Sequence, residues 1–164
     1  MTTRFLKTIR FDTSDTFAFP LAAEPDEWAI SGGFAFADLT TDDLTGKVRQ
    51  AFANGFLGLT SFGFTTLTSV ATMTPEERGG VVDRLAQHLI DVYGAPGRDE
   101  ARAAADGEVA FIEDLVDGCL INSLFCVSRT FDEDGQIVES FRKLERRIDG
   151  GPIYFGEEEQ PNEP

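Results

Sequence analysis

The chain has 164 residues, 41% of them hydrophobic and 26% charged, which is typical of one globular domain that folds without disulfides or metal. Its formal net charge of −15 argues against nucleic-acid binding, which needs Lys and Arg to neutralise phosphates, and against adsorption to anionic membranes. No apolar run reaches transmembrane length and the N-terminus lacks a signal-peptide pattern, so we expect a cytoplasmic protein. The unusual number is 15 Phe against 1 Trp and 2 Tyr.

The N-terminal part of the chain predicts short strands around one helix. Residues 4–11 alternate between apolar and polar side chains, as a half-buried strand does, and residues 16–19 predict a second short strand. Residues 28–37 carry bulky apolar side chains at even positions and small ones at odd positions, which predicts a strand with one closely approachable face. Hydroxyl and acidic residues at the start of 40–54 favour a helix there. Residues 61–72, rich in Phe and Thr, predict another strand.

Two further helices are expected in the middle of the chain. Thr74-Pro75-Glu76-Glu77 combines a hydroxyl cap, a proline at the first helical position and a glutamate three residues after the cap. The apolar stripe that follows predicts a helix that ends at Gly94. Residues 98–117 predict a third helix with one apolar side.

The C-terminal part predicts a β-hairpin and then a tail. Residues 120–131 and 136–147 are expected to pair as strands around a turn in which Gly135 adopts a positive φ. The strand over 136–147 carries many charges, which suits an edge or a solvated face. The order of elements predicts an α+β fold, a mostly antiparallel sheet of five or six strands with three helices on one face. We expect one domain over residues 1–155 and an acidic disordered tail over 156–164.

Motifs for metal, nucleotide or nucleophilic chemistry are missing from the sequence. Cys119 and Cys126 are interpreted as two reduced thiols, since a disulfide between them needs a sharp bend and a zinc site needs about four ligands. A Ser or Cys nucleophile would have to use His88, the only histidine, and the alternative is a histidine at the edge of the helix. The glycine spacing fits no phosphate loop. We therefore expect neither a cofactor nor a metal.

A carboxylate on the third helix is the first candidate site residue. Glu108 falls inside the apolar arc of that helix, so it must be paired, shifted in pKa or at the edge of the packed stripe. One interpretation is a salt bridge to a strand arginine such as Arg129. The other is a general acid or base in a pocket. In both cases we expect less than a third of Glu108 to be exposed.

The remaining candidates lie on the first and last strands and in one turn. Basic residues gather on the first strand (Arg4, Lys7, Arg10) and the last (Arg142, Lys143, Arg146, Arg147). If these strands are neighbours, they form a positive strip for an anionic ligand or an acidic partner, although edge protection and ordinary ion pairs explain the same charges. Asp12 and Asp15, in the turn that follows the first strand, either hold a cation or form an Asx turn.

Three stretches carry a resemblance to a known family. They are 8–17, with Thr8-Ile9-Arg10-Phe11-Asp12 and Ser14-Asp15-Thr16-Phe17, then 33–39, and then 50–58. Together they resemble a family of small bacterial proteins catalogued only as a domain of unknown function, with likeness over about residues 4–147. The resemblance implies a self-contained bacterial, intracellular protein and assigns no catalytic residue.

Two functions follow as hypotheses. The first is a non-catalytic interaction or accessory protein, with a possible protein partner. A sheet with an uncovered Phe-rich face would expose a large apolar patch, so we also expect a homodimer or a second layer of loops. The alternative is a small anionic-ligand-binding protein or an enzyme that uses Arg and carboxylate side chains in a Phe-lined pocket. Convergence of Glu108 and Arg129 with Asp12 or Asp15 at one cavity would favour the alternative.

Overall fold

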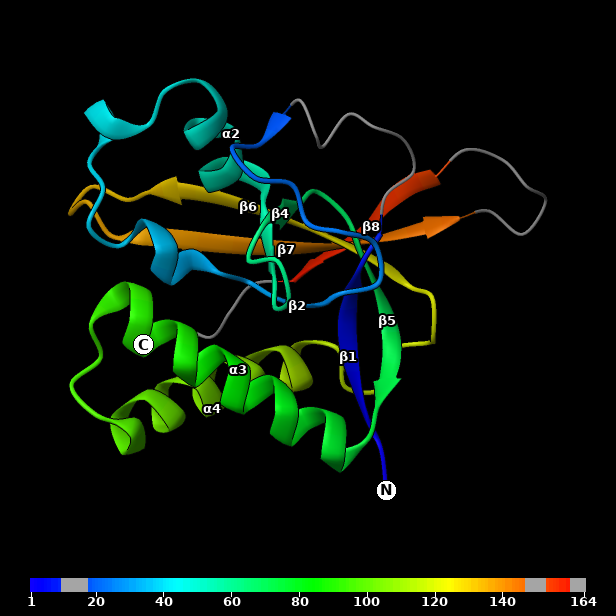
Figure 1. Ribbon diagram of the computed structural model, residues 1–164. Helices are drawn as coiled ribbons and strands as arrows, with labels where there is room; N and C mark the ends of the chain where they lie inside the picture. Colours follow the sequence, from blue (N-terminus) through cyan, green and yellow to red (C-terminus); the bar gives the residue numbers. More distant parts are fainter. Residues whose placement is uncertain (10–17, 147–152, 160–164) are drawn as a thin grey trace.

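One antiparallel sheet organises the computed structural model, which describes residues 1–9, 18–146 and 153–159 (Figure 1). Within these ranges the sheet has eight strands in the order β4-β3-β2-β1-β5-β6-β7-β8, and every neighbouring pair is antiparallel. The strands are β1 (Thr3–Thr8), β2 (Trp28–Ile30), β3 (Phe56–Gly58), β4 (Phe64–Thr65), β5 (Thr68–Met73), β6 (Leu124–Phe131), β7 (Ile137–Arg146) and β8 (Ile153–Glu159). The α+β class and the antiparallel sheet are thus confirmed, with more strands than expected.

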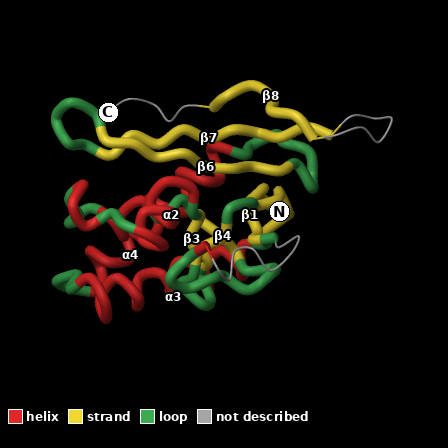
Figure 2. Tube along the Cα trace, turned by 90° about the horizontal axis from the view of Figure 1, so that it is seen from above, coloured by secondary structure: helices red, strands yellow, loops and turns green. Residues whose placement is uncertain are grey.

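Three α-helices and two short 3₁₀ helices complete the described fold. The α-helices lie on the same side of the ribbon formed by β6, β7 and β8 (Figure 2). Of these, α3 packs along α4, α4 also contacts β1 and β2, and α2 packs on β6. In the described ranges, none of the helices combines the length and the apolar character needed to span a bilayer. The helices are η1 (Gly33–Phe36), η2 (Thr41–Asp43), α2 (Gly46–Asn54), α3 (Pro75–Tyr93) and α4 (Arg98–Leu115).

Phenylalanine side chains fill the core where the sheet curls over itself. Phe141 of β7 reaches both Phe56 of β3 and Phe111 of α4, with ring centroids 6.2 Å and 5.5 Å away. Phe56 and Phe141 are fully buried. A second, smaller apolar cluster surrounds α2 and includes Phe36 and Phe52. Because such rings bury large areas and prefer edge or offset contacts, they hold the two ends of the curled sheet together.

The helix signals in the sequence match the structure at α3. The Thr74 hydroxyl accepts from the Glu77 amide at 3.1 Å, while the Glu77 carboxylate accepts from the Thr74 amide at 2.9 Å. The helix ends at Gly94, whose φ of 70° is left-handed. Thr40 and Asp43 form the same capping box, but they start η2, and α2 begins only at Gly46.

Three expected strands are shorter or divided in the structure, and the simplest case is the strand expected over 120–131, which begins only at Leu124. The strand expected over 28–37 ends at Ile30, because Gly32 adopts a φ of 80° and the chain turns into η1. A Cβ at Gly32 would lie 2.6 Å from the Leu57 Cβ, so the glycine permits close packing on β3. The strand expected over 61–72 is divided into β4 and β5.

The expected positive strip does not form, because β5 and β6 separate β1 from β7. Arg4 and Lys7 therefore lie on a different part of the sheet from Arg142 and Lys143. Strand β7 is also not an edge, since β8 pairs along it. The tail boundary expected at residue 156 falls inside β8. Arg10, Arg147 and residues 160–164 lie outside the described residues.

Candidate functional site

An apolar cavity of about 300 Å³ lies between η1, α2, the turn from β3 to β4 and the C-terminal end of α3. We call it the aromatic cavity. Of the described residues that line it, only His88 and Tyr93 carry a polar side chain. The lining residues are Pro20, Ala35, Phe36, Leu39, Val48, Ala51, Leu57, Phe62, Phe64, His88, Val92 and Tyr93.

A short stack of rings forms one side of the aromatic cavity. The His88 imidazole lies face to face with the Phe62 ring, with centroids 3.6 Å apart and an interplanar angle of 1°. Tyr93 meets His88 edge-on at 5.6 Å. Burial lowers the pKa of His88, and the charge of Asp91 opposes this only partly. The imidazole is therefore neutral at pH 7, with one nitrogen able to donate and one able to accept.

The phase of α3 explains why these two polar residues face the cavity. Val81, Leu85 and Leu89 are the buried stripe of the helix, and His88 lies beside that stripe rather than in it. Val92 and Tyr93 occupy the last turn before the chain reverses at Gly94, and they are 60% and 44% exposed. They therefore form an open rim, while His88 lies deeper.

The turn that carries Phe62 is anchored by a buried carboxylate, Glu27, which is only 5% exposed. Its Oε1 accepts from the Thr60 and Ser61 amides, each at 2.8 Å, and its Oε2 accepts from the Ser61 hydroxyl at 2.6 Å. Burial alone would raise the pKa of Glu27, but the hydrogen bonds from Ser61, Thr60 and Glu24 outweigh burial and lower it. Glu27 is thus held as a charged group by backbone and hydroxyl donors.

The anchored turn holds the backbone of Phe62 in a left-handed conformation, which is unfavourable for this residue by itself. Its φ is 57°, and a bulky side chain is uncommon in this left-handed region. Arg84 on α3 adds a second tie by donating to the Thr60 carbonyl at 3.2 Å. The wall formed by Phe62 is therefore built in advance of any ligand.

Sequence reasoning assigned no role to Glu27 and treated it as part of a loop. Its partners Thr60 and Ser61 are 33 and 34 positions away in the chain. No local pattern marks such an acid, because an exposed loop glutamate has the same neighbours in sequence. The cavity itself was anticipated only as a Phe-lined pocket, without His88 or Tyr93.

Arg129, a predicted site residue, is buried and fully engaged in holding the fold together. It donates to the Phe52 carbonyl at 2.9 Å and the Ala51 carbonyl at 3.3 Å, at the C-terminal end of α2, and also to the Ser31 carbonyl. Its Nε pairs with Glu139 at 2.7 Å, directly across the strand pair. The salt bridge expected from Glu108 is thus made by Glu139 instead.

Glu108 lies half-buried on α4 beside that ion pair. Burial raises its pKa to about 7, the negative charge of Glu139 adds to the rise, and Arg129 opposes it. Glu108 and Arg129 are therefore close enough to influence each other. Glu108 lines none of the cavities described here.

Of the other predicted site residues, the structure describes only Arg142, which does not join this pair. Arg142 lies opposite Cys126 in the β6–β7 ladder, three positions after Glu139, so the pleat places it on the other face of the sheet. Burial raises the pKa of the Cys126 thiol, and the charge of Arg142 opposes this. Arg10, Asp12 and Asp15 lie outside the described residues. Neither Cys119 nor Cys126 forms a disulfide within the described residues.

A second hollow, of about 260 Å³, lies beside Arg129 and is lined by Arg49, Phe52 and Phe131 among others. The Phe52 and Phe131 rings stack at 4.8 Å. The guanidinium of Arg129 already donates to carbonyls and to Glu139. The exposed Arg49 is therefore the cation with which this hollow could bind a ligand.

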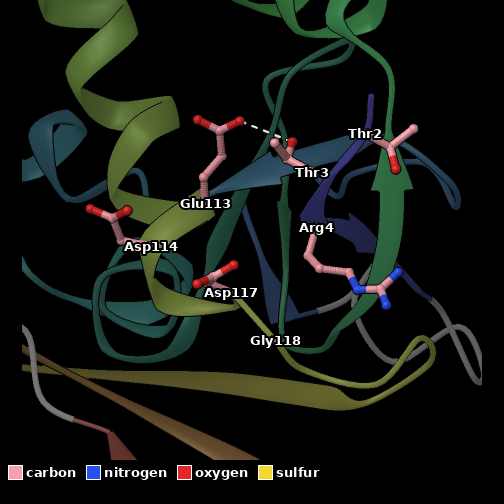
Figure 3. A pocket seen from close by; sticks show the side chains of 7 residues that line it. All are labelled: Thr2, Thr3, Arg4, Glu113, Asp114, Asp117 and Gly118. Atoms are coloured by element: carbon pink, nitrogen blue, oxygen red, sulfur yellow. Dashed lines mark hydrogen bonds between the residues drawn. The ribbon is translucent and has the colours of Figure 1, made fainter.

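A larger but strongly polar hollow, of about 610 Å³, lies between β1 and the end of α4 (Figure 3). Its best-placed carboxylate, Glu113, accepts from Thr3 at 3.0 Å and pairs with Arg78 at 3.0 Å. Asp114 and Asp117 are exposed. Of the acidic residues that line this hollow, Glu113 is thus paired within the fold while Asp114 and Asp117 face solvent, so the aromatic cavity is the stronger candidate.

Comparison with known proteins places the chain in a family. Residues 2–152 match the model of the family described as "Family of unknown function (DUF6505)". The chain belongs to this family. The match extends slightly beyond the resemblance expected over residues 4–147. Neither the curated proteins nor the solved structures gave a match.

Proposed function

We propose that this protein binds a small, ring-containing, largely apolar molecule in the aromatic cavity and does not transform it. The observation that carries the proposal is the lining itself, in which phenyl and aliphatic groups surround two polar side chains. This composition is typical of small-molecule sites. The prebuilt wall at Phe62 supports the same proposal, because a site that is ordered in advance spends less free energy on binding.

Binding is favoured over catalysis by the chemistry of the lining. Among the described residues that line the cavity, His88 is the one group that titrates near neutral pH, and none of them carries a carboxylate, a thiol or an amine. General acid–base catalysis usually needs a second group positioned to exchange a proton with the first. We therefore keep the non-catalytic role of the first sequence hypothesis, and we propose an apolar ligand where the alternative hypothesis expected an anionic one.

A second candidate is a cytoplasmic accessory protein with a protein partner, or a homodimer. It is favoured by Leu120 and Ile121, which are 79% and 42% exposed in the loop between α4 and β6. Two side chains cover far less area than the ~1,200 Å² of a small stable interface. This candidate therefore comes second. Light scattering at micromolar concentration tests it, and a purely monomeric protein would argue against the homodimer.

The experiment that tests the cavity compares two alanines of one segment. Ala35 lines the aromatic cavity, whereas Ala37 is exposed nearby. We expect Ala35→Leu to weaken binding of indole or 2-naphthol at least tenfold, because the added side chain occupies the cavity. Ala37→Leu is the matched control and should bind as the wild type does. Saturation-transfer NMR measures both. Equal binding by the two variants, or no binding by the wild type, would refute the proposal.

A further inference from the structure

We propose that the aromatic cavity selects an uncharged ring compound with one hydroxyl or N–H donor, and that His88 accepts this donor. This inference deepens the proposed function and rests on it. The ligand class is thus phenol-like or indole-like, as opposed to a carboxylate, an amine or a plain hydrocarbon.

The stacking geometry of His88 limits how a ligand can reach it. One face of the imidazole is covered by Phe62 at 3.6 Å. Hydrogen bonds to imidazole lie in the plane of the ring, so a partner must approach the ring edge. In the described part of the chain, neither the His88 nor the Tyr93 side chain has a hydrogen-bond partner. Tyr93 is exposed enough to bond to water, whereas the half-buried edge of the His88 ring is free of partners among the described residues and can accept from a ligand donor.

The uncharged character of the described lining disfavours ionic ligands. No Lys, Arg, Asp or Glu is among its described lining residues. A carboxylate or ammonium group would lose its hydration on entry and gain no opposite charge, which is strongly unfavourable. A donor that remains neutral loses much less hydration, and the neutral imidazole can replace what it loses.

The volume and the walls limit the size of the ligand. A cavity of about 300 Å³ is at the lower end of the range for small-molecule sites, which suits one or two fused rings. Phe36 and Phe64, with centroids 5.6 Å apart and rings inclined by 35°, offer ring edges and faces to a planar ligand. Aromatic pairs favour such offset or tilted contacts.

The test compares three probes of the same size on the full chain at pH 7, with affinities from NMR titration. We expect 2-naphthol to bind about five- to tenfold more tightly than naphthalene, the gain typical of one hydrogen bond. We expect 2-naphthoate to bind most weakly. If naphthalene equals 2-naphthol, or 2-naphthoate binds best, the ligand class is wrong while the proposed function stands. If none of the three binds, the proposed function itself fails.

A variant then assigns the hydrogen bond to His88. His88→Phe keeps a ring on Phe62 but removes both nitrogens, so naphthalene should bind as before and the advantage of 2-naphthol should disappear. Tyr93→Phe, which removes only a hydroxyl at the rim, is the comparison and should keep most of that advantage. A persistent preference for 2-naphthol in His88→Phe, or its loss in Tyr93→Phe alone, would transfer the role to Tyr93 and overturn the assignment. If His88→Phe does not fold, Tyr93→Phe still tests the assignment. Loss of the preference for 2-naphthol in that variant overturns it, and a retained preference supports it.

Discussion

Two carboxylates in this molecule, the buried Glu27 and the half-buried Glu139, are stabilised in opposite ways. Glu27 accepts hydrogen bonds from backbone amides and the Ser61 hydroxyl, whereas Glu139 pairs with the buried guanidinium of Arg129. The first arrangement needs no counter-cation and fixes a turn beside the aromatic cavity. The second joins α2, β2, β6 and β7, and it leaves Glu108 on α4 beside a second carboxylate. The comparison shows that buried charge serves the site in one place and the assembly of the fold in the other.

The largest effect is expected where the ion pair is broken. Arg129→Met leaves Glu139 without its cation and the Phe52 carbonyl without the guanidinium donor, so we expect a loss of about 3–5 kcal/mol in the free energy of unfolding. Urea unfolding followed by circular dichroism measures it. The double variant with Glu139→Gln should recover part of the loss, because it removes the unpaired charge. A loss below about 1 kcal/mol in Arg129→Met would show that this ion pair does not hold the elements together.

A smaller effect is expected at the amide-bound carboxylate. Glu27→Gln is nearly isosteric but replaces one acceptor oxygen with a donor group that faces amides, so we expect a loss of about 2–3 kcal/mol. Binding of 2-naphthol should weaken as well, because the Phe62 turn loses its anchor.

Asp26→Asn is the matched control for Glu27→Gln. It removes the same charge one residue away at an exposed position, and asparagine tolerates the φ of 66° found there. We expect little change in either unfolding or binding. If Glu27→Gln binds 2-naphthol as tightly as the wild type does, the anchored turn does not contribute to binding in the aromatic cavity.

The smallest effect is a dependence on pH that distinguishes the two regions. Because burial and Glu139 raise the pKa of Glu108 from 4.5 to about 7, the folded state holds a proton that the unfolded state releases. The free energy of unfolding should therefore fall as pH rises from about 4.5 to about 7. Glu27, whose pKa is lowered, acts in the opposite sense and loses its contribution only as pH falls below about 4.5.

Glu108→Gln isolates the contribution of this carboxyl. The variant should lack the fall in stability between pH 4.5 and 7 and should exceed the wild type by on the order of 1–2 kcal/mol at pH 8. Glu100→Gln, which removes a charge from the exposed first turn of α4, controls for overall charge. Parallel pH profiles for wild type and Glu108→Gln would contradict the raised pKa.

Local chemistry was readable from the sequence, whereas contacts between distant segments were not. The capping box at Thr74, the left-handed Gly94 and the turn at Gly135, with a φ of 78°, each depend on neighbours within a few residues. The end of β2 depends on Gly32 packing against Leu57, and an alternating pattern from 28 to 37 does not contain that information. Glu108 was singled out because helix phase is local.

The candidate site depended almost entirely on long-range contacts. His88 was recognised as the only histidine, but its stack on Phe62 joins two segments that the sequence pattern does not connect. Arg129 was selected as a partner of Glu108, and the strand register instead placed it opposite Glu139. Register follows from the turn at Asp132–Gly135, so this pairing was within reach of sequence reasoning, whereas the Glu27 anchor was not.

The short strand at one end of the sheet limits how other chains can attach to the protein. β4 has only two residues, and the backbone of Phe64 already exchanges hydrogen bonds with Leu21 and Ala23. An added strand needs a row of free amides and carbonyls, and this edge offers almost none. A peptide strand or a growing fibril therefore has few free backbone groups to pair with at β4. A partner that binds at this edge must contact side chains instead.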